Sequence, residues 1–189
     1  MKPLICLPGW ATTGDIFQGI NATIIDRLDP KRFEDDLLSL NFKSATLCGF
    51  SMGGFAAYEF AKKYPELVKK LILISVRPSY PKTELDFVRS LLKRNPKAYL
   101  KEFYKSCFAT QEELEKFKPP EFSLDELLAG LEYLESATVG PLPPDTICIH
   151  GTQDKIAPIT EAQKLTSKLT EINTGHIPFF SKYFLNQIR

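Results

Sequence analysis

Short, unbroken runs of hydrophobic residues recur along the chain, and the segments between them show helical spacing. The clearest runs are Leu-Ile-Leu-Ile at 71–74 and Ile-Cys-Ile at 147–149. Hydrophobic runs without alternation are typical of parallel strands that are covered on both faces. We predict six strands, of which the last is the weakest, at residues 3–7, 22–26, 45–49, 70–75, 146–150 and 170–173.

Helix signals fall between these strands. Asp29 followed by Pro30 is a typical helix start and predicts a helix that runs to about residue 40. Thr160 and Gln163 have the spacing of a capping box ahead of the last strand. Strands and helices that alternate in this way predict a layered α/β fold with right-handed crossovers and a mainly parallel sheet.

The alternation breaks between residues 75 and 146, where no strand is predicted. Helix starts with an acidic residue three positions later occur at Thr83, Thr110 and Ser123. Asn95-Pro96 separates two further helices, because proline suits the first turn of a helix and not its interior. Four helices are therefore predicted before the penultimate strand. We interpret residues 1–80 and 142–189 as the core and residues 81–141 as a helical lid.

The chain totals fit one globular domain, since 189 residues can bury a full hydrophobic core. The net charge of +1 provides no field that would attract nucleic acid. The hydrophobic runs are far too short to span a bilayer. The N-terminal run is broken by Pro8 and Gly9, which fits a first strand better than a signal peptide.

The cysteines do not form a metal or redox motif, because no two of them have C-x-x-C spacing. Three of the four lie in predicted strands, where a thiol packs as a small hydrophobe. We interpret them as reduced, which predicts a cytoplasmic protein. The four are Cys6, Cys48, Cys107 and Cys148.

The candidate chemistry centres on Gly-Phe-Ser-Met-Gly-Gly at residues 49–54. This segment follows a predicted strand and opens a helix-like run, the context in which G-x-S-x-G forms a nucleophile elbow. Small residues are needed there because strand and helix approach closely and the serine adopts an unfavourable backbone conformation. Ser51 is therefore the candidate nucleophile of a hydrolase.

A serine nucleophile needs a base and an acid that orients the base. Asp154 follows the fifth predicted strand and His176 follows the sixth, in the chain order serine, acid, histidine. Both would lie on loops at the carboxyl ends of strands, where α/β sheets place their sites. His150 is the competing base, and we expect it to end a strand and pack beside Gly151.

Acyl transfer also needs main-chain N–H donors for the developing oxyanion. The residue after the nucleophile, Met52, supplies one donor. The loop after the first strand supplies the second, with Gly9 permitting a tight turn and Trp10 donating its N–H. We expect Trp10, the one tryptophan of the sequence, to wall the acyl pocket as well. No metal or organic cofactor is needed.

These residues resemble the α/β-hydrolase superfamily over the whole chain. More narrowly, the chain is similar to the biotin-pathway pimeloyl-[acyl-carrier-protein] methyl ester esterases. The matching pieces are Gly9-Trp10, the elbow at 49–54, and His-Ile-Pro-Phe at 176–179 with Ser181 after it. The resemblance implies a Ser51, Asp154 and His176 triad, with Trp10 and Met52 as oxyanion donors. It implies a three-layer α/β-hydrolase fold that cleaves the methyl ester of a carrier-bound dicarboxylic acid.

The chain departs from that family in several ways. Pro8 stands where the family usually has histidine, and Gly9 precedes Ser51 by only 42 positions. The sequence also starts at the oxyanion-loop strand, without the antiparallel strands that usually precede it. We therefore expect a reduced sheet of about six strands.

A basic stripe lies within the predicted lid: Arg89, Lys93, Arg94, Lys97, Lys101 and Lys105. One interpretation is a patch that docks an acidic partner such as an acyl carrier protein, and the other is an ordinary solvated face. Two alternatives for the whole protein stay open. It is either a generic short-chain carboxylesterase or thioesterase with the same triad, or an inactive hydrolase fold that binds a partner. We expect a monomer.

Overall fold

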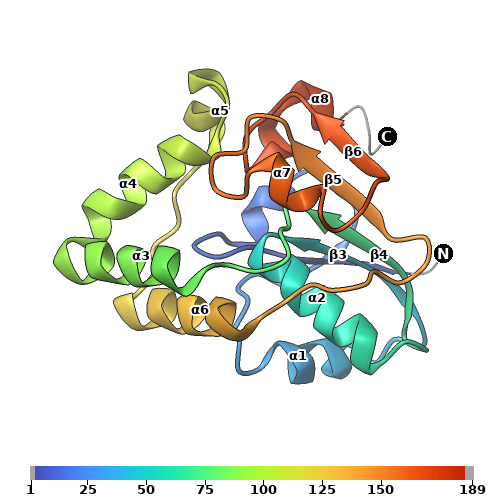
Figure 1. Cartoon of the computed structure of the whole chain (residues 1–189). Helices are drawn as coiled ribbons and strands as arrows, with labels where there is room; N and C mark the ends of the chain where they lie inside the picture. Colours follow the sequence, from blue (N-terminus) through green and yellow to red (C-terminus); the bar gives the residue numbers. More distant parts are fainter. Residues whose placement is uncertain (1–2, 186–189) are drawn as a thin grey trace.

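The computed structural model describes residues 3–185 and contains one six-stranded sheet, in the order β2-β1-β3-β4-β5-β6, in which every pair is parallel. Figure 1 shows helices on both sides of this sheet. All six predicted strands are confirmed, with ends that differ by no more than a few residues. They are β1 (Leu4–Leu7), β2 (Thr23–Ile24), β3 (Ala45–Phe50), β4 (Val68–Ile74), β5 (Ile147–Gly151) and β6 (Leu169–Ile172).

Two helical groups accompany the sheet. The first alternates with the strands: α1 (Phe33–Ser39), α2 (Met52–Lys63), α7 (Ile159–Ala162) and α8 (Lys182–Leu185), with short 3-10 turns η1 (Gly14–Phe17) and η2 (Pro178–Phe180). The second is the predicted set of four helices between β4 and β5: α3 (Lys82–Arg94), α4 (Pro96–Cys107), α5 (Gln111–Lys116) and α6 (Leu124–Ser136). Figure 1 shows this second group together on one side of the molecule.

Three of the predicted helix starts are confirmed. The Asn95 side chain accepts a hydrogen bond from the Ala98 N–H and caps α4, with Pro96 in its first turn. Thr110 and Ser123 both form complete capping boxes, at the starts of α5 and α6. The boundary between α3 and α4 is therefore set by two neighbouring residues, Asn95 and Pro96.

Three other predicted starts were wrong. Helices α3 and α7 each begin directly after a proline with extended backbone, Pro81 and Pro158, so Thr83 and Thr160 already lie inside the helix and do not cap it. Asp29 forms a turn instead, in which its side chain accepts from the Lys31 N–H. The first helix therefore begins only at Phe33.

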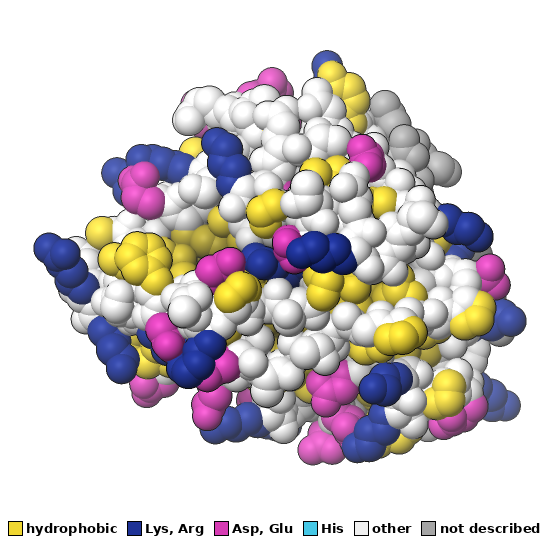
Figure 2. Space-filling model, in the orientation of Figure 1, with side chains coloured by type: hydrophobic (Ala, Val, Ile, Leu, Met, Phe, Trp, Pro, Cys, Tyr) yellow, Lys and Arg dark blue, Asp and Glu magenta, His cyan; other side chains and the backbone are white. Residues whose placement is uncertain are grey.

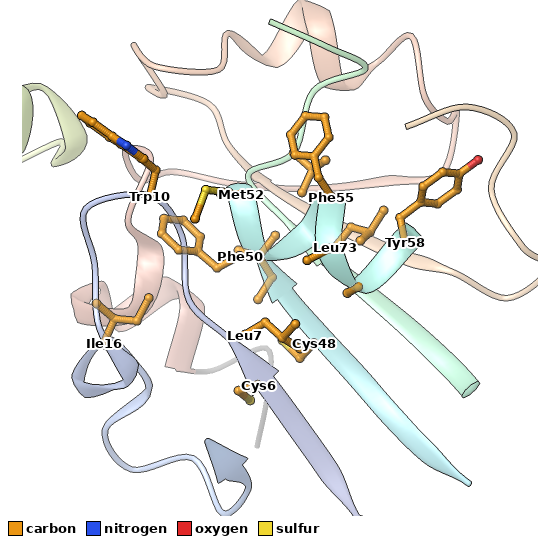
Figure 3. Close-up of a cluster of buried hydrophobic side chains, with 14 of the residues drawn as sticks. Cys6, Leu7, Trp10, Ile16, Cys48, Phe50, Met52, Phe55, Tyr58 and Leu73 are labelled. Atoms are coloured by element: carbon orange, nitrogen blue, oxygen red, sulfur yellow. The ribbon is translucent and has the colours of Figure 1, made fainter. Parts of the chain in front are cut away.

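The core lies on both faces of the central strands. Phe55 and Phe60 are buried where α2 packs on β3, and Leu47 and Leu73 fill the strand side of the same layer. Phe50 points to the other face of the sheet, where its ring packs against Phe179. Figure 3 labels Phe50, Phe55 and Leu73 among these core residues. The four cysteines are buried and free, as predicted. Among the described residues, no helix combines the length and the hydropathy that crossing a membrane would require.

Candidate active site

Ser51 occupies the sharp turn between β3 and α2. Its backbone has φ 50°, in the left-handed region that non-glycine residues rarely adopt. A Cβ on Gly49 would lie 2.3 Å from the Gly53 carbonyl oxygen, and one on Gly53 would lie 2.3 Å from the Leu7 carbonyl oxygen. The predicted need for small residues is thus explained by the close approach of strand, helix and the neighbouring strand β1.

The structure brings the three predicted side chains together in one line of hydrogen bonds. The Ser51 hydroxyl lies 3.0 Å from His176 Nε2, and His176 Nδ1 lies 2.7 Å from Asp154 Oδ2. Since a carboxylate only accepts, Nδ1–H donates to Asp154 and Nε2 is left to accept from the serine hydroxyl. All three residues are buried. This is the arrangement in which an imidazole can remove the serine proton.

Asp154 is held from both sides. Its Oδ1 accepts the main-chain N–H groups of Ile156 and Ala157, both at 2.8 Å, and its side chain is 0% exposed. Burial alone would raise the pKa of this carboxyl, but the charge of His176 and hydrogen bonds from His150 and His176 outweigh it and hold the pKa well below its usual range. The carboxylate is therefore the form that the site stabilises.

His150 was predicted to pack beside Gly151 at a strand end, and the structure shows it buried at the end of β5. Its Nε2 lies 2.6 Å from the Ala157 carbonyl oxygen and 3.2 Å from Asp154 Oδ2. Because a carbonyl only accepts, Nε2 carries a proton, which both oxygens share. His150 thus supports the acid and does not contact Ser51, a role that the spacing of the sequence did not reveal.

The loop that carries His176 is held by two contacts from distant segments. The Ser75 hydroxyl donates to the His176 carbonyl oxygen at 2.7 Å, and the Ile177 N–H donates to the Cys107 carbonyl oxygen at 3.0 Å. The Phe50 ring packs against the imidazole, with ring centroids 5.2 Å apart. Ser75 has φ 55° and was not singled out from the sequence.

The predicted oxyanion donors flank the nucleophile. A Cβ on Gly9 would lie 3.0 Å from the Ser51 Cβ, so the loop after β1 runs directly beside the serine. Within residues 3–185, no protein acceptor bonds the main-chain N–H of Trp10 or of Met52. Figure 3 shows Trp10 and Met52 next to each other above the ends of β1 and β3. Neither N–H group is therefore engaged by the described part of the protein.

A pocket of about 250 Å³ opens onto Ser51 and His176. Its walls are mainly apolar and come from α3, α4 and α6, through residues that include Val88, Tyr99, Phe103, Leu131 and Leu134. Phe87 stands at its rim with 64% of its surface exposed. Figure 2 shows hydrophobic side chains gathered on this side of the molecule with charged groups around them. An apolar pocket with few polar groups suits an acyl chain.

Polar groups at the pocket are few. Tyr80 lines it, and burial together with the charge of Asp154 raises the pKa of its hydroxyl, so Tyr80 is neutral. Glu84 and Lys155 lie at its edge, where Glu84 pairs with the buried Arg77 at 3.0 Å. No group of three or more potential metal ligands is found among residues 3–185.

The basic stripe divides into two kinds of residue. Arg89 pairs with Asp86 and Glu135 and donates to the Leu131 carbonyl oxygen, so its charge is compensated and ties α3 to α6. The others are exposed on α3 and α4, and within the described part of the chain no ion pair is found for them: Lys93, Arg94, Lys97 and Lys101. Lys105 pairs with Glu102.

Comparison with known proteins points to the same fold. Residues 29–116 match the family model of the alpha/beta hydrolase fold. The chain is 25% identical to a pimeloyl-[acyl-carrier protein] methyl ester esterase of Aromatoleum aromaticum, over 79% of this chain and 73% of that protein. It is 28% identical to the AB hydrolase superfamily protein YisY of Bacillus subtilis, over 77% of this chain. The chain spans 65% of the length of the latter.

Solved structures share the whole architecture. An esterase from Exiguobacterium antarcticum superimposes with a TM-score of 0.82 at 19% identity, and the match covers 100% of this chain and 90% of that one. At this identity the likeness describes the fold. Together, the family match over residues 29–116, the sequence relatives and the six-stranded parallel sheet show that the chain has an α/β-hydrolase fold and resembles the α/β hydrolases in sequence.

Proposed function

We propose that the protein is a serine hydrolase that cleaves a carboxylic ester through an acyl-enzyme. The observation that carries this proposal is the hydrogen-bonded line from Ser51 through His176 to Asp154, with the serine on a strained turn at the mouth of an apolar pocket. A buried, polar constellation of this kind is costly to assemble without a chemical role.

The reaction follows from the geometry. His176 Nε2 takes the Ser51 proton as Oγ attacks the ester carbonyl, and the main-chain N–H groups of Trp10 and Met52 stabilise the oxyanion. The protonated imidazole then donates its proton to the leaving alkoxide, which departs as the alcohol. Water, deprotonated by the same nitrogen, attacks the acyl carbonyl. The bond between Ser51 Oγ and the acyl carbon breaks, Oγ takes the proton back from the imidazole, and the carboxylic acid is released. Asp154 keeps Nδ1 protonated throughout.

The helices α3 to α6 are the proposed lid. Residues 81–141 supply most of the pocket wall, whereas the remaining segments, 1–80 and 142–189, supply all three reacting side chains. In this division, the core performs the chemistry and the lid selects the acyl group.

The preferred substrate is the methyl ester of a pimeloyl group on its acyl carrier protein, in biotin biosynthesis, acted on by a cytoplasmic monomer. Support comes from the relative in Aromatoleum aromaticum and from the exposed lysines of α4, a helix whose other face lines the pocket. Gly9 and the basic residues of α3 and α4 would then contact the substrate or its carrier. Arg89 is the weakest of these, since two carboxylates already engage it.

A generic short-chain carboxylesterase or thioesterase is the second candidate, since the pocket holds no feature that excludes a free ester. The two differ in their dependence on the carrier. We expect kcat/KM for pimeloyl methyl ester to be higher on the carrier protein than in the free form. Equal values would favour the generic esterase.

The general proposal is tested with Ser51→Ala and a p-nitrophenyl ester. Removal of a nucleophile that works as one unit with its base lowers kcat by several orders of magnitude, about 10⁶-fold in the largest cases. The matched control is Ser90→Ala, because Ser90 is exposed on α3 and bonds only the Phe87 carbonyl oxygen. If the wild-type protein hydrolyses neither p-nitrophenyl esters nor pimeloyl methyl ester, free or carrier-bound, the inactive binding protein is the better description.

A further inference from the structure

The loop that carries the proposed oxyanion donor, residues 9–12, is buried and meets the inserted helices on one side. Residues 9–12 are closed by contacts of their own: the Gly9 N–H donates to Thr12 Oγ1 at 2.9 Å, and the Thr12 hydroxyl donates back to the Gly9 carbonyl oxygen at 3.0 Å. Ala11 has φ 56°, a conformation that costs free energy in any residue other than glycine. Such a loop needs external contacts to hold one geometry.

Helix α4 supplies the first external contact. The Tyr104 hydroxyl donates to the Ala11 carbonyl oxygen at 2.7 Å, and this pair is buried. The Phe103 ring meets the Trp10 indole edge to face, with centroids 5.1 Å apart. The last residue of the helix, Cys107, accepts from Ile177 beside the proposed base. The final turn of α4 therefore touches both loops that flank Ser51.

Helix α6 supplies the second contact. The Trp10 indole N–H donates to the Leu127 carbonyl oxygen at 2.9 Å. A Cβ on Gly130 would lie 2.5 Å from Trp10 Cδ1 and 3.3 Å from Met52 Sδ, so the absence of a side chain there lets the indole pack closely against the helix. Both contacts come from the inserted helices, 93 and 117 residues away in sequence.

We propose that α4 and α6 set the position of the oxyanion donor, with Tyr104 and Gly130 as positioning residues, so that movement of the inserted helices changes the rate of the chemical step. This inference rests on the proposed function. Tyr104 touches no reacting atom and acts through the Ala11 carbonyl and the adjacent Trp10 N–H. The exposed lysines of α4 lie on the same helix, so a partner bound there would act on this loop.

The test compares two variants with two matched controls. Tyr104→Phe removes one buried hydrogen bond, and we expect kcat for a p-nitrophenyl ester to fall about tenfold with KM unchanged. Gly130→Ala places a methyl group against the indole, and a larger fall is expected. Tyr133→Phe removes an exposed tyrosine bond to Glu59, and Gly140→Ala meets only the Tyr58 hydroxyl at 3.3 Å. Both controls should retain wild-type kcat.

Intrinsic fluorescence supplies a readout that does not need catalysis, because Trp10 is the sole tryptophan of the sequence. Acrylamide quenching should rise in Tyr104→Phe and stay at the wild-type level in Tyr133→Phe. Unchanged quenching and unchanged kcat in Tyr104→Phe would overturn the inference, as would an equal loss of kcat in Tyr133→Phe. A rise in KM with kcat unchanged in Tyr104→Phe would also overturn it.

Two outcomes need separate treatment. If Gly130→Ala does not fold, as judged by its urea midpoint, Tyr104→Phe decides. If the wild-type protein hydrolyses no ester, the proposed function fails, and quenching alone decides whether these helices hold the loop.

Discussion

The two regions that meet at Ser51 are stabilised in different ways. The sheet side holds its three reacting groups by buried hydrogen bonds, and Asp154 alone accepts two main-chain N–H groups and contacts two imidazoles. The inserted helices make aromatic contacts with Trp10 and within α4, and exposed ion pairs such as Lys82 with Glu135 join α3 to α6. Exposed pairs contribute little to stability. The reacting side chains are thus held rigidly, whereas the pocket wall formed by the inserted helices is more easily altered.

The strongest test of this comparison is Asp154→Asn. The asparagine oxygen can still accept from the Ile156 and Ala157 N–H groups, but its amide no longer fixes the proton on His176 Nδ1. We expect kcat to fall about 10³- to 10⁴-fold, as when the acid of other triads is changed. Asp145→Asn is the control, since Asp145 is exposed in the loop before β5. A loss below tenfold for Asp154→Asn would contradict the assigned role.

The rigidity of the elbow is tested by Gly53→Ala. Alanine is the better helix former by about 1 kcal/mol, but its Cβ would lie 2.3 Å from the Leu7 carbonyl oxygen, and β1 would have to move. We expect the free energy of unfolding to fall by about 2–4 kcal/mol, measured by urea denaturation. Gly140→Ala should change it by less than about 1 kcal/mol. An equal change in both variants would remove the argument for close packing.

The role of the pocket wall is tested by Val88→Phe. Val88 is half-buried and lines the pocket, so the larger ring should shorten it. We expect kcat/KM for long-chain p-nitrophenyl esters to fall about 10- to 100-fold, and for the acetate ester to stay the same. Thr83→Phe is the control, because Thr83 is exposed on the same helix and outside the pocket. A uniform loss across chain lengths would place the acyl group elsewhere.

The smallest effect is expected from the exposed charges. Lys97→Glu combined with Lys101→Glu should lower kcat/KM for a carrier-bound ester about tenfold at low salt, with the free ester unaffected, and the difference should shrink as salt rises. Lys69→Glu with Lys70→Glu is the control, because these exposed lysines lie at the amino end of β4. The same loss on free and carrier-bound esters would contradict docking at α4.

Features encoded by neighbouring residues could be predicted from the sequence. The strands, the elbow at residues 49–54 and the capping boxes at Thr110 and Ser123 all depend on residues a few positions apart. The starts at Thr83 and Thr160 failed for a local reason too. Each helix follows a proline in extended conformation and begins two residues earlier than the capping pattern indicated.

Features that depend on how loops return to the sheet could not be predicted. His150 reaches Asp154 only because the intervening loop turns back on the end of β5. The contacts of Ser75 with His176, and of Tyr104 with Ala11, join residues about a hundred positions apart through one polar atom each. No periodicity in the chain carries that information, since a single serine or tyrosine has the same local pattern in many environments.

The short strand β2 has a consequence for association between molecules. It forms one outer edge of the sheet with only two residues, and Ile24 there is 38% exposed. Unpaired backbone at a sheet edge is the template on which another chain can add a strand, and a very short edge offers too few hydrogen bonds for a stable addition. The edge formed by β2 therefore resists sheet extension, and any strand addition is expected at the opposite edge, where β6 has four residues.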